Sequence, residues 1–203
     1  MRAIWLCGML LLAATPAFGQ PASDPDARIK QMRAQVPCRN VTKIPLRGPD
    51  GRVGEVETGP YPYLDPSGNL IIYPGETITL ALAKDGTGMP RLLKFADAKG
   101  AQQFAQPSAN DATLEFQFSQ MDGKTDMMLM VSNATSAVIK YDAVMSAVSD
   151  RGIDRVGTST CPVNPPSSGQ AAFFNTESWQ HPIMRMIIRN IRPLAASASR
   201  ACE

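Results

Sequence analysis

Apolar and polar residues alternate most clearly between positions 112 and 146. Leu114, Phe116 and Phe118 alternate with polar neighbours, the period of two that is typical of a strand with one buried face. An apolar run at 126–132 and a second alternating run at 137–146 follow, and polar turn residues separate all three. The pattern predicts a three-stranded antiparallel meander, with the last two strands joined as a hairpin.

Shorter apolar runs bounded by proline and glycine precede and follow this meander. Residues 70–73 and 77–82 have the composition of strands, and residues 40–46 and 156–161 give weaker signals of the same kind. Seven or more short strands with regular turns predict an all-β fold, an antiparallel β-sandwich of immunoglobulin-like type. Many unrelated functions share this architecture, so the fold does not identify an activity.

Two terminal segments depart from this pattern. Asp24 and Pro25 are suited to begin a short helix. The helix would place three apolar residues on one face: Ile29, Met32 and Val36. Residues 178–194 fit both an amphipathic helix with an arginine stripe and a strand. Their isoleucines and the all-β context favour the strand.

The first nineteen residues have the pattern of a cleaved signal peptide. Arg2 precedes an apolar run at 4–14, and Ala17-Phe18-Gly19 forms a small-x-small cleavage site. The run is shorter than the roughly 20 residues of a spanning helix, so no transmembrane segment is expected in the mature chain. The expected location is secreted or periplasmic. A polar lead-in (20–37), one sandwich domain (38–194) and a flexible tail (195–203) would follow.

Three cysteines remain after such a cleavage: Cys38, Cys161 and Cys202. An oxidising compartment favours pairing of two of them. Cys202 lies in a tail of small residues, whereas Cys38 and Cys161 border the predicted core. We therefore expect a disulfide between Cys38 and Cys161, with Cys202 free or paired with another chain.

Charge and residue chemistry exclude several classes of function. Twenty basic and eighteen acidic residues give a net charge of +2, which does not indicate a nucleic-acid partner. The last quarter is the most basic, through Arg185, Arg189, Arg192 and Arg200. These arginines could contact an anionic surface, although a solvated face of a strand or helix explains them more simply.

No recognisable catalytic or cofactor motif is present. His181 is the only histidine, and no GxSxG motif accompanies it, which leaves a hydrolase poorly supported. Thioether and imidazole ligands suit copper, so His181, Met184 and Met186 make a periplasmic copper-binding protein the alternative hypothesis. Methionine also packs readily in cores, which is the competing explanation. No cofactor is expected in the leading hypothesis.

The leading hypothesis is a non-enzymatic binding, structural or assembly module with an unknown protein or envelope partner. Its recognition surface is expected on the loops at 52–68 and 162–170, because binding residues concentrate on loops. Tyr61 and Tyr63, set among prolines, are candidates for an exposed aromatic binding surface. Capping one end of the core is the alternative role for the two tyrosines.

Export predicts a defined mature N-terminus. The protein recovered from the secreted or periplasmic fraction is expected to begin at Gln20, because the small-x-small site ends at Gly19. Intact-mass spectrometry of both fractions measures this directly. Full-length protein found only in the cytosol, with residues 1–19 attached, would contradict the prediction.

Overall fold

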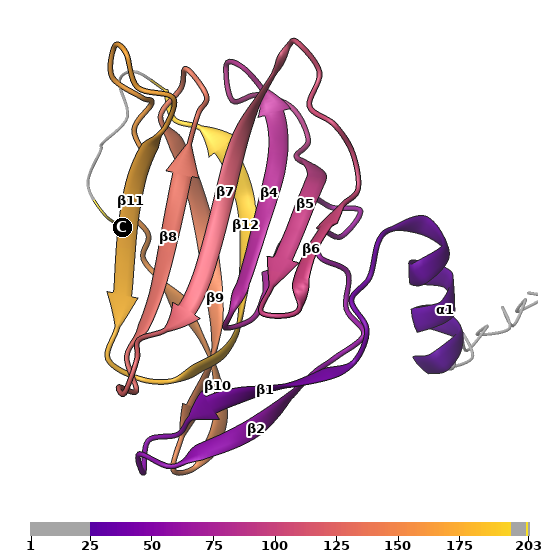
Figure 1. The fold of residues 1–203 in the computed structure, drawn as a ribbon, viewed down its shortest axis with the longest axis vertical. Coiled ribbons are helices and arrows are strands. Elements are labelled where there is room, and N and C mark those ends of the chain that lie inside the picture. Colours follow the sequence, from indigo (N-terminus) through magenta and orange to yellow (C-terminus); the bar gives the residue numbers. More distant parts are fainter. Residues whose placement is uncertain (1–24, 196–201, 203) are drawn as a thin grey trace, which may run out of the picture.

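The computed structural model describes residues 25–195 and Cys202, and its ribbon is dominated by strands (Figure 1). The predicted signal peptide and most of the predicted tail lie outside these residues. The described elements run in this order: α1 (Pro25–Gln35), β1 (Thr42–Arg47), β2 (Val53–Thr58), β3 (Leu70–Ile72), β4 (Glu76–Ala83), β5 (Arg91–Asp97), β6 (Gly100–Gln103), β7 (Asp111–Gln120), β8 (Met127–Asn133), β9 (Ile139–Ser149), β10 (Gly152–Thr158), β11 (Phe173–Trp179) and β12 (Ile183–Pro193).

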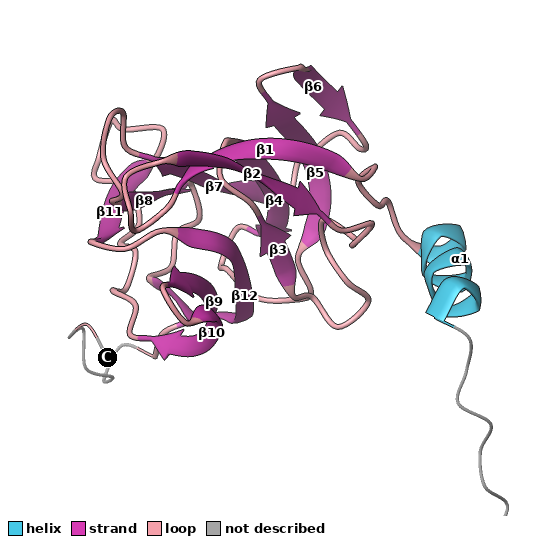
Figure 2. Ribbon diagram, turned by 90° about the horizontal axis from the view of Figure 1, so that it is seen from below, coloured by secondary structure: helices cyan, strands magenta, loops and turns pink. Residues whose placement is uncertain are grey.

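Two antiparallel sheets form the body of the protein. One sheet has six strands in the order β11-β8-β7-β4-β5-β6, and the other has four in the order β10-β9-β12-β3. The β1–β2 hairpin forms a separate two-stranded sheet that lies across one end of the sandwich (Figure 2). The predicted all-β antiparallel sandwich is confirmed. Its two main sheets together hold more strands than the seven to nine of immunoglobulin domains.

The core lies between the two main sheets. The alternating residues of β7 point into it, and Leu114, Phe116 and Phe118 are fully buried. Tyr141 of β9 meets Phe116 from the opposite sheet, with the rings edge to face and 5.6 Å between centroids. The period of two therefore located the inward faces of both strands correctly.

The predicted hairpin between residues 126–132 and 137–146 is wrong, because β8 and β9 belong to different sheets. The polar connection carries the chain across the core instead of reversing it within one sheet. Asn133 Nδ2 donates to the carbonyls of Ala137, Val163 and Asn164. Its Oδ1 accepts from the backbone N–H and hydroxyl of Thr135. This buried hydrogen-bond network holds the connection that carries the chain from one sheet to the other.

Both ambiguous terminal segments now have a defined structure. Residues 25–35 are helical, as predicted. The favoured strand at the C-terminal end is confirmed, since β12 pairs with β9 and with β3. Residues 52–68, which were expected to be irregular, contain β2 paired with β1. Within the described residues, no helix is long and apolar enough to cross a bilayer.

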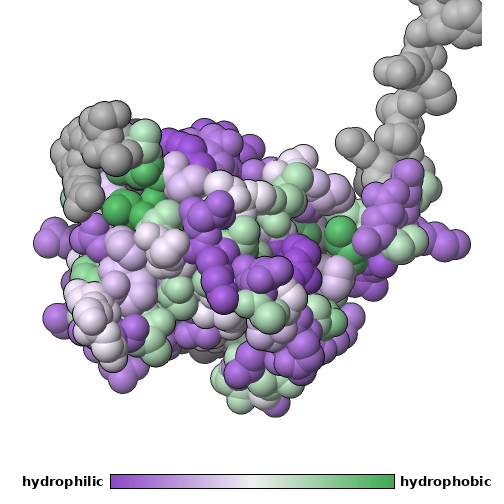
Figure 3. Space-filling view, turned by 90° about the horizontal axis from the view of Figure 1, so that it is seen from above, coloured by the Kyte–Doolittle hydropathy of each residue, from purple (hydrophilic) through white to green (hydrophobic). Residues whose placement is uncertain are grey.

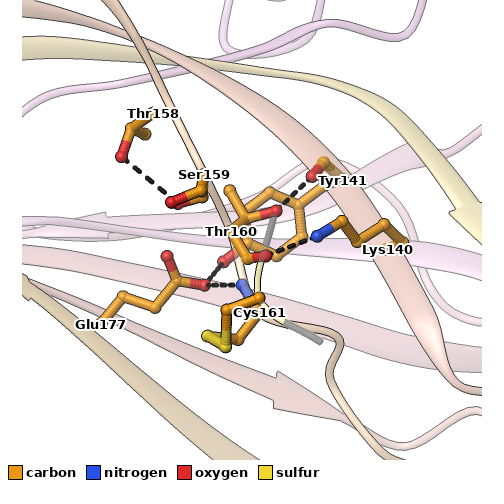
Figure 4. Close-up of a disulfide and its surroundings, with 8 residues drawn as sticks. Lys140, Tyr141, Thr158, Ser159, Thr160, Cys161 and Glu177 are labelled. Atoms are coloured by element: carbon orange, nitrogen blue, oxygen red, sulfur yellow. Dashed lines mark hydrogen bonds between the residues drawn. A yellow bond between two sulfur atoms is a disulfide. The ribbon is translucent and has the colours of Figure 1, made fainter. Parts of the chain in front are cut away.

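The predicted disulfide between Cys38 and Cys161 is wrong. Cys161 bonds Cys202, with 4.1 Å between Cα atoms, and Cys38 has a free thiol. Cys38 forms a β-bridge with Pro62, whereas the backbone N–H of Cys161 donates to Glu177 (Figure 4). Tyr141 donates to the same carboxylate oxygen. Cys38 and Cys161, which both border the predicted core, therefore have different neighbours in the structure.

The observed pairing predicts a specific stability difference. Cys202→Ser should lower the free energy of unfolding by about 2–4 kcal/mol, because a crosslink over a separation of 41 residues restricts the unfolded chain. Denaturant titration measures the change. Cys38→Ser is the matched control and should leave stability nearly unchanged. The reverse order of the two variants would support the Cys38–Cys161 pairing.

Candidate functional site

The segment that carries both candidate tyrosines is held against residues 37–39 and against β3. The N–H of Arg39 donates to the carbonyl of Tyr61, and the N–H of Tyr63 donates to the carbonyl of Pro37. The N–H of Ile71 in β3 donates to the carbonyl of Tyr63. Residues 59–64 are therefore tied on both sides by main-chain hydrogen bonds.

A buried ion pair, Arg39 with Glu76, anchors this arrangement to the six-stranded sheet. Nε and Nη2 of Arg39 each donate to a different oxygen of Glu76 at 2.9 Å, and the two side chains are only 3% and 7% exposed. The remaining guanidinium donors bond the carbonyls of Tyr61, Pro62 and Ile71. All five donors of a guanidinium group thus have an acceptor.

Two tyrosine rings enclose the Arg39 guanidinium. Its central carbon lies 4.7 Å from the ring centroid of Tyr63 and 4.9 Å from that of Tyr73. Burial raises the pKa of the Glu76 carboxyl, while the Arg39 charge and hydrogen bonds act in the opposite direction. Burial also raises the pKa of the Tyr73 phenol. Both oxygens of Glu76 are occupied, since Tyr73 N–H donates to one of them as well.

The two predicted binding tyrosines have different environments. Tyr63 is buried and packs against Phe95 and Phe104, so it belongs to the core. Tyr61 is 41% exposed, and the guanidinium carbon of Arg185 lies 5.1 Å from its ring centroid. Arg185 is half-buried in β12, and its Nη2 lies 3.5 Å from the hydroxyl of Ser146 in β9. Tyr61, Arg185 and Ser146 are together named the Tyr61 cluster.

A groove of about 440 Å³ lies between the β1–β2 hairpin and the end of the six-stranded sheet. Two contacts bridge it: Lys99 Nζ to the hydroxyl of Thr42, and the backbone of Arg47 to the side-chain amide of Gln120. Its lining combines apolar side chains with charged ones of both signs, including Ile44, Val53, Met121, Lys124 and Asp122. No group of three or more His, Cys, Asp or Glu suited to a metal ion occurs among residues 25–195 and Cys202.

The copper alternative gains no support from the positions of its residues. Met186 is fully buried in the core beside Met145 and Ile72, its partners in the sheet register. Met184 packs against the same core, whereas His181 is exposed in the turn before β12. An ion bound by Met186 would have to enter the hydrophobic interior, so core packing explains these methionines.

The second predicted loop, residues 162–170, lies at the end opposite the hairpin. Val163 is buried and pairs with Ile139, which fixes the start of the loop. Pro165 and Pro166 line a shallow hollow with Lys84 and Ser136. Hydrophilic and hydrophobic residues mix on this end of the molecule, with a small strongly hydrophobic patch toward the upper left of the view (Figure 3). The loop does not lie near either candidate tyrosine.

Comparisons with protein families, curated proteins and solved structures find no match to this chain. The site is therefore argued from its own residues. Sequence reasoning missed the Arg39–Glu76 pair, although Glu76 is in phase with the inward residues Ile78 and Leu80 of β4. A carboxylate on an otherwise apolar face is the signal that points to a buried partner. No comparable pattern surrounds Arg39.

The buried ion pair predicts that removing one partner costs far more stability than replacing both. Arg39→Ala should lower the free energy of unfolding by about 3–5 kcal/mol, because it leaves the Glu76 carboxylate buried without its partner. The double variant Arg39→Met with Glu76→Leu should recover much of this loss. Chemical denaturation of all the variants measures both effects.

The exposed pair Lys43–Glu55 provides the matched control, with side chains 64% and 67% exposed. Lys43→Ala should change stability by less than about 1 kcal/mol. Equal losses at Arg39 and Lys43 would contradict the anchoring role of the buried pair.

Proposed function

We propose that this chain is an exported, non-enzymatic binding module that engages a protein partner through the Tyr61 cluster. The observation that carries the proposal is an exposed aromatic ring on an immobilised segment. Tyr61 is 41% exposed, yet its carbonyl accepts hydrogen bonds from both the backbone and the side chain of Arg39.

Immobilisation matters because ordering a flexible loop opposes binding. A ring already held in one orientation loses little conformational freedom when a partner covers it. Tyrosine and arginine are also enriched among the residues that dominate interface energies. The stacking of Tyr61 on Arg185 places both residue types in one cluster.

Export is supported by two independent features. The first nineteen residues have the pattern of a signal peptide, although they lie outside the described residues. The disulfide between Cys161 and Cys202 fits an oxidising compartment, since such bonds rarely persist in the cytosol.

A binding role also agrees with the environments of the titratable groups. His181 is exposed in a turn, and the carboxylate of Glu76 is engaged by Arg39. Glu177 accepts from Tyr141 and from the N–H of Cys161, and burial raises the pKa of its carboxyl. The two buried carboxylates thus serve internal contacts, which supports a module without chemistry of its own.

A comparison of two exposed aromatic residues tests the proposal. The mature chain is immobilised and used to capture partners from the native envelope extract, and quantitative mass spectrometry measures the retained proteins. Tyr61→Ala should reduce the retained partner about tenfold or more, as expected for a dominant interface residue.

Phe174→Ala is the matched control, because Phe174 is 61% exposed on the edge strand β11. It should retain the partner at the wild-type level. Identical captured sets for wild type and Tyr61→Ala would refute the proposed binding surface.

A further inference from the structure

Arg185 is a partly enclosed cation without a carboxylate partner. Its Nε is buried and has no hydrogen-bond acceptor. No ion pair of Arg185 occurs among the described residues, and its side chain meets only neutral groups there, the hydroxyls of Ser146 and Tyr73 and the ring of Tyr61. Enclosing a charge without a counter-charge costs free energy. An added carboxylate would lower that cost.

The sheet register places a second arginine beside Ser146. Ser146 of β9 pairs with Arg185 of β12 on one side and with Arg155 of β10 on the other. Directly paired residues project from the same face of a sheet, and neighbouring strands lie about 4.8 Å apart. The Cα atoms of Arg155 and Arg185 are therefore separated by about 10 Å, with the buried residue Ser146 between them.

Arginines outnumber the carboxylates on this face among the described residues. Arg189 stands opposite Asp142, but that carboxylate already accepts hydrogen bonds from Asn190 and Arg192. Asp154, next to Arg155, alternates to the other face of β10 and accepts from Ser149. Arg155 and Arg189 are exposed and have no ion pair among the described residues.

The centre of the same face is apolar. Val144 of β9 pairs with Ile187 of β12, and both are half-buried. This row lies between the row of Arg155 and Arg185 and the row of Arg189. A ligand that covers the face thus meets an apolar strip flanked on both sides by arginines.

We infer that the outer face of the four-stranded sheet binds an acidic segment of a protein partner, with one carboxylate held between the side chains of Arg185 and Arg155. The inference rests on the proposed binding function and names the chemistry of its partner. Arginine and carboxylate form charge-assisted, often bidentate, hydrogen bonds. The apolar strip favours a polypeptide, whose apolar side chains cover Val144 and Ile187, over a sulfated polysaccharide that has none.

A fluorescein-labelled peptide tests the inference directly. The probe has ten residues: five glutamates, two leucines and three glycines. Fluorescence anisotropy measures its affinity for the mature protein at low ionic strength. Arg155→Gln and Arg185→Gln should each weaken binding about tenfold, and added salt should weaken the wild-type complex. The same peptide with glutamine in place of glutamate should not bind.

Lys94→Gln is the matched control, because Lys94 is exposed on β5 of the other sheet and its loss changes the net charge equally. It should leave the affinity unchanged. Circular dichroism and thermal melting establish that each variant is folded. Arg155 is exposed and makes no ion pair in the described part of the chain, so Arg155→Gln decides the outcome even if Arg185→Gln unfolds.

Three results would overturn the inference: no binding of the probe to wild type, equal loss in Lys94→Gln and Arg155→Gln, or tighter arginine-dependent binding of heparin than of the peptide. The last result would identify a sulfated polysaccharide as the occupant. A failed peptide experiment combined with Tyr61-dependent capture would leave the proposed binding function standing. Loss of both peptide binding and Tyr61-dependent capture would refute the inference and the proposed function together.

Discussion

The buried ion pair between Arg39 and Glu76 determines where the N-terminal segment lies on the sandwich. Removing two charges from water is costly, and their attraction offsets this cost only when every donor and acceptor is satisfied. Arg39 meets the condition, with acceptors on Glu76, Tyr61, Pro62 and Ile71. Hydrophobic residues of similar size can stabilise a fold equally well. The particular contribution of this pair is therefore the position of residues 59–64.

The strands were predictable because a period of two marks a buried face whichever strand lies beside it. Leu114, Phe116 and Phe118 show this directly. The pairing of strands was not predictable from the same pattern, since inward residues of β8 and β9 alternate identically in one sheet or in two. Hydrogen bonds from Asn133 to the distant carbonyls of Val163 and Asn164 accompany the crossing. Contacts over such separations leave no periodic signal in the sequence.

The candidate site was predicted only in part, because contacts from distant strands decide the roles of its residues. Prolines around Tyr61 and Tyr63 indicated an unusual segment, but only burial separates the exposed ring from the core ring. The arginines of β12 were correctly placed on a face away from the core, yet their roles differ. Arg192 pairs with Asp142, whereas Arg185 lies against the ring of Tyr61. Partners from other strands make this difference, and composition alone does not reveal it.

Arg39 and Arg185 provide an internal comparison. Both lie against tyrosine rings, so cation–π attraction is available to each. Arg39 has a carboxylate and a full set of acceptors, while Arg185 has a buried Nε without any acceptor. An arginine that serves only to stabilise the fold is expected to resemble Arg39. The unfilled hydrogen-bonding capacity of Arg185, beside an exposed ring on a fixed backbone, is better explained by an anionic group that arrives from outside.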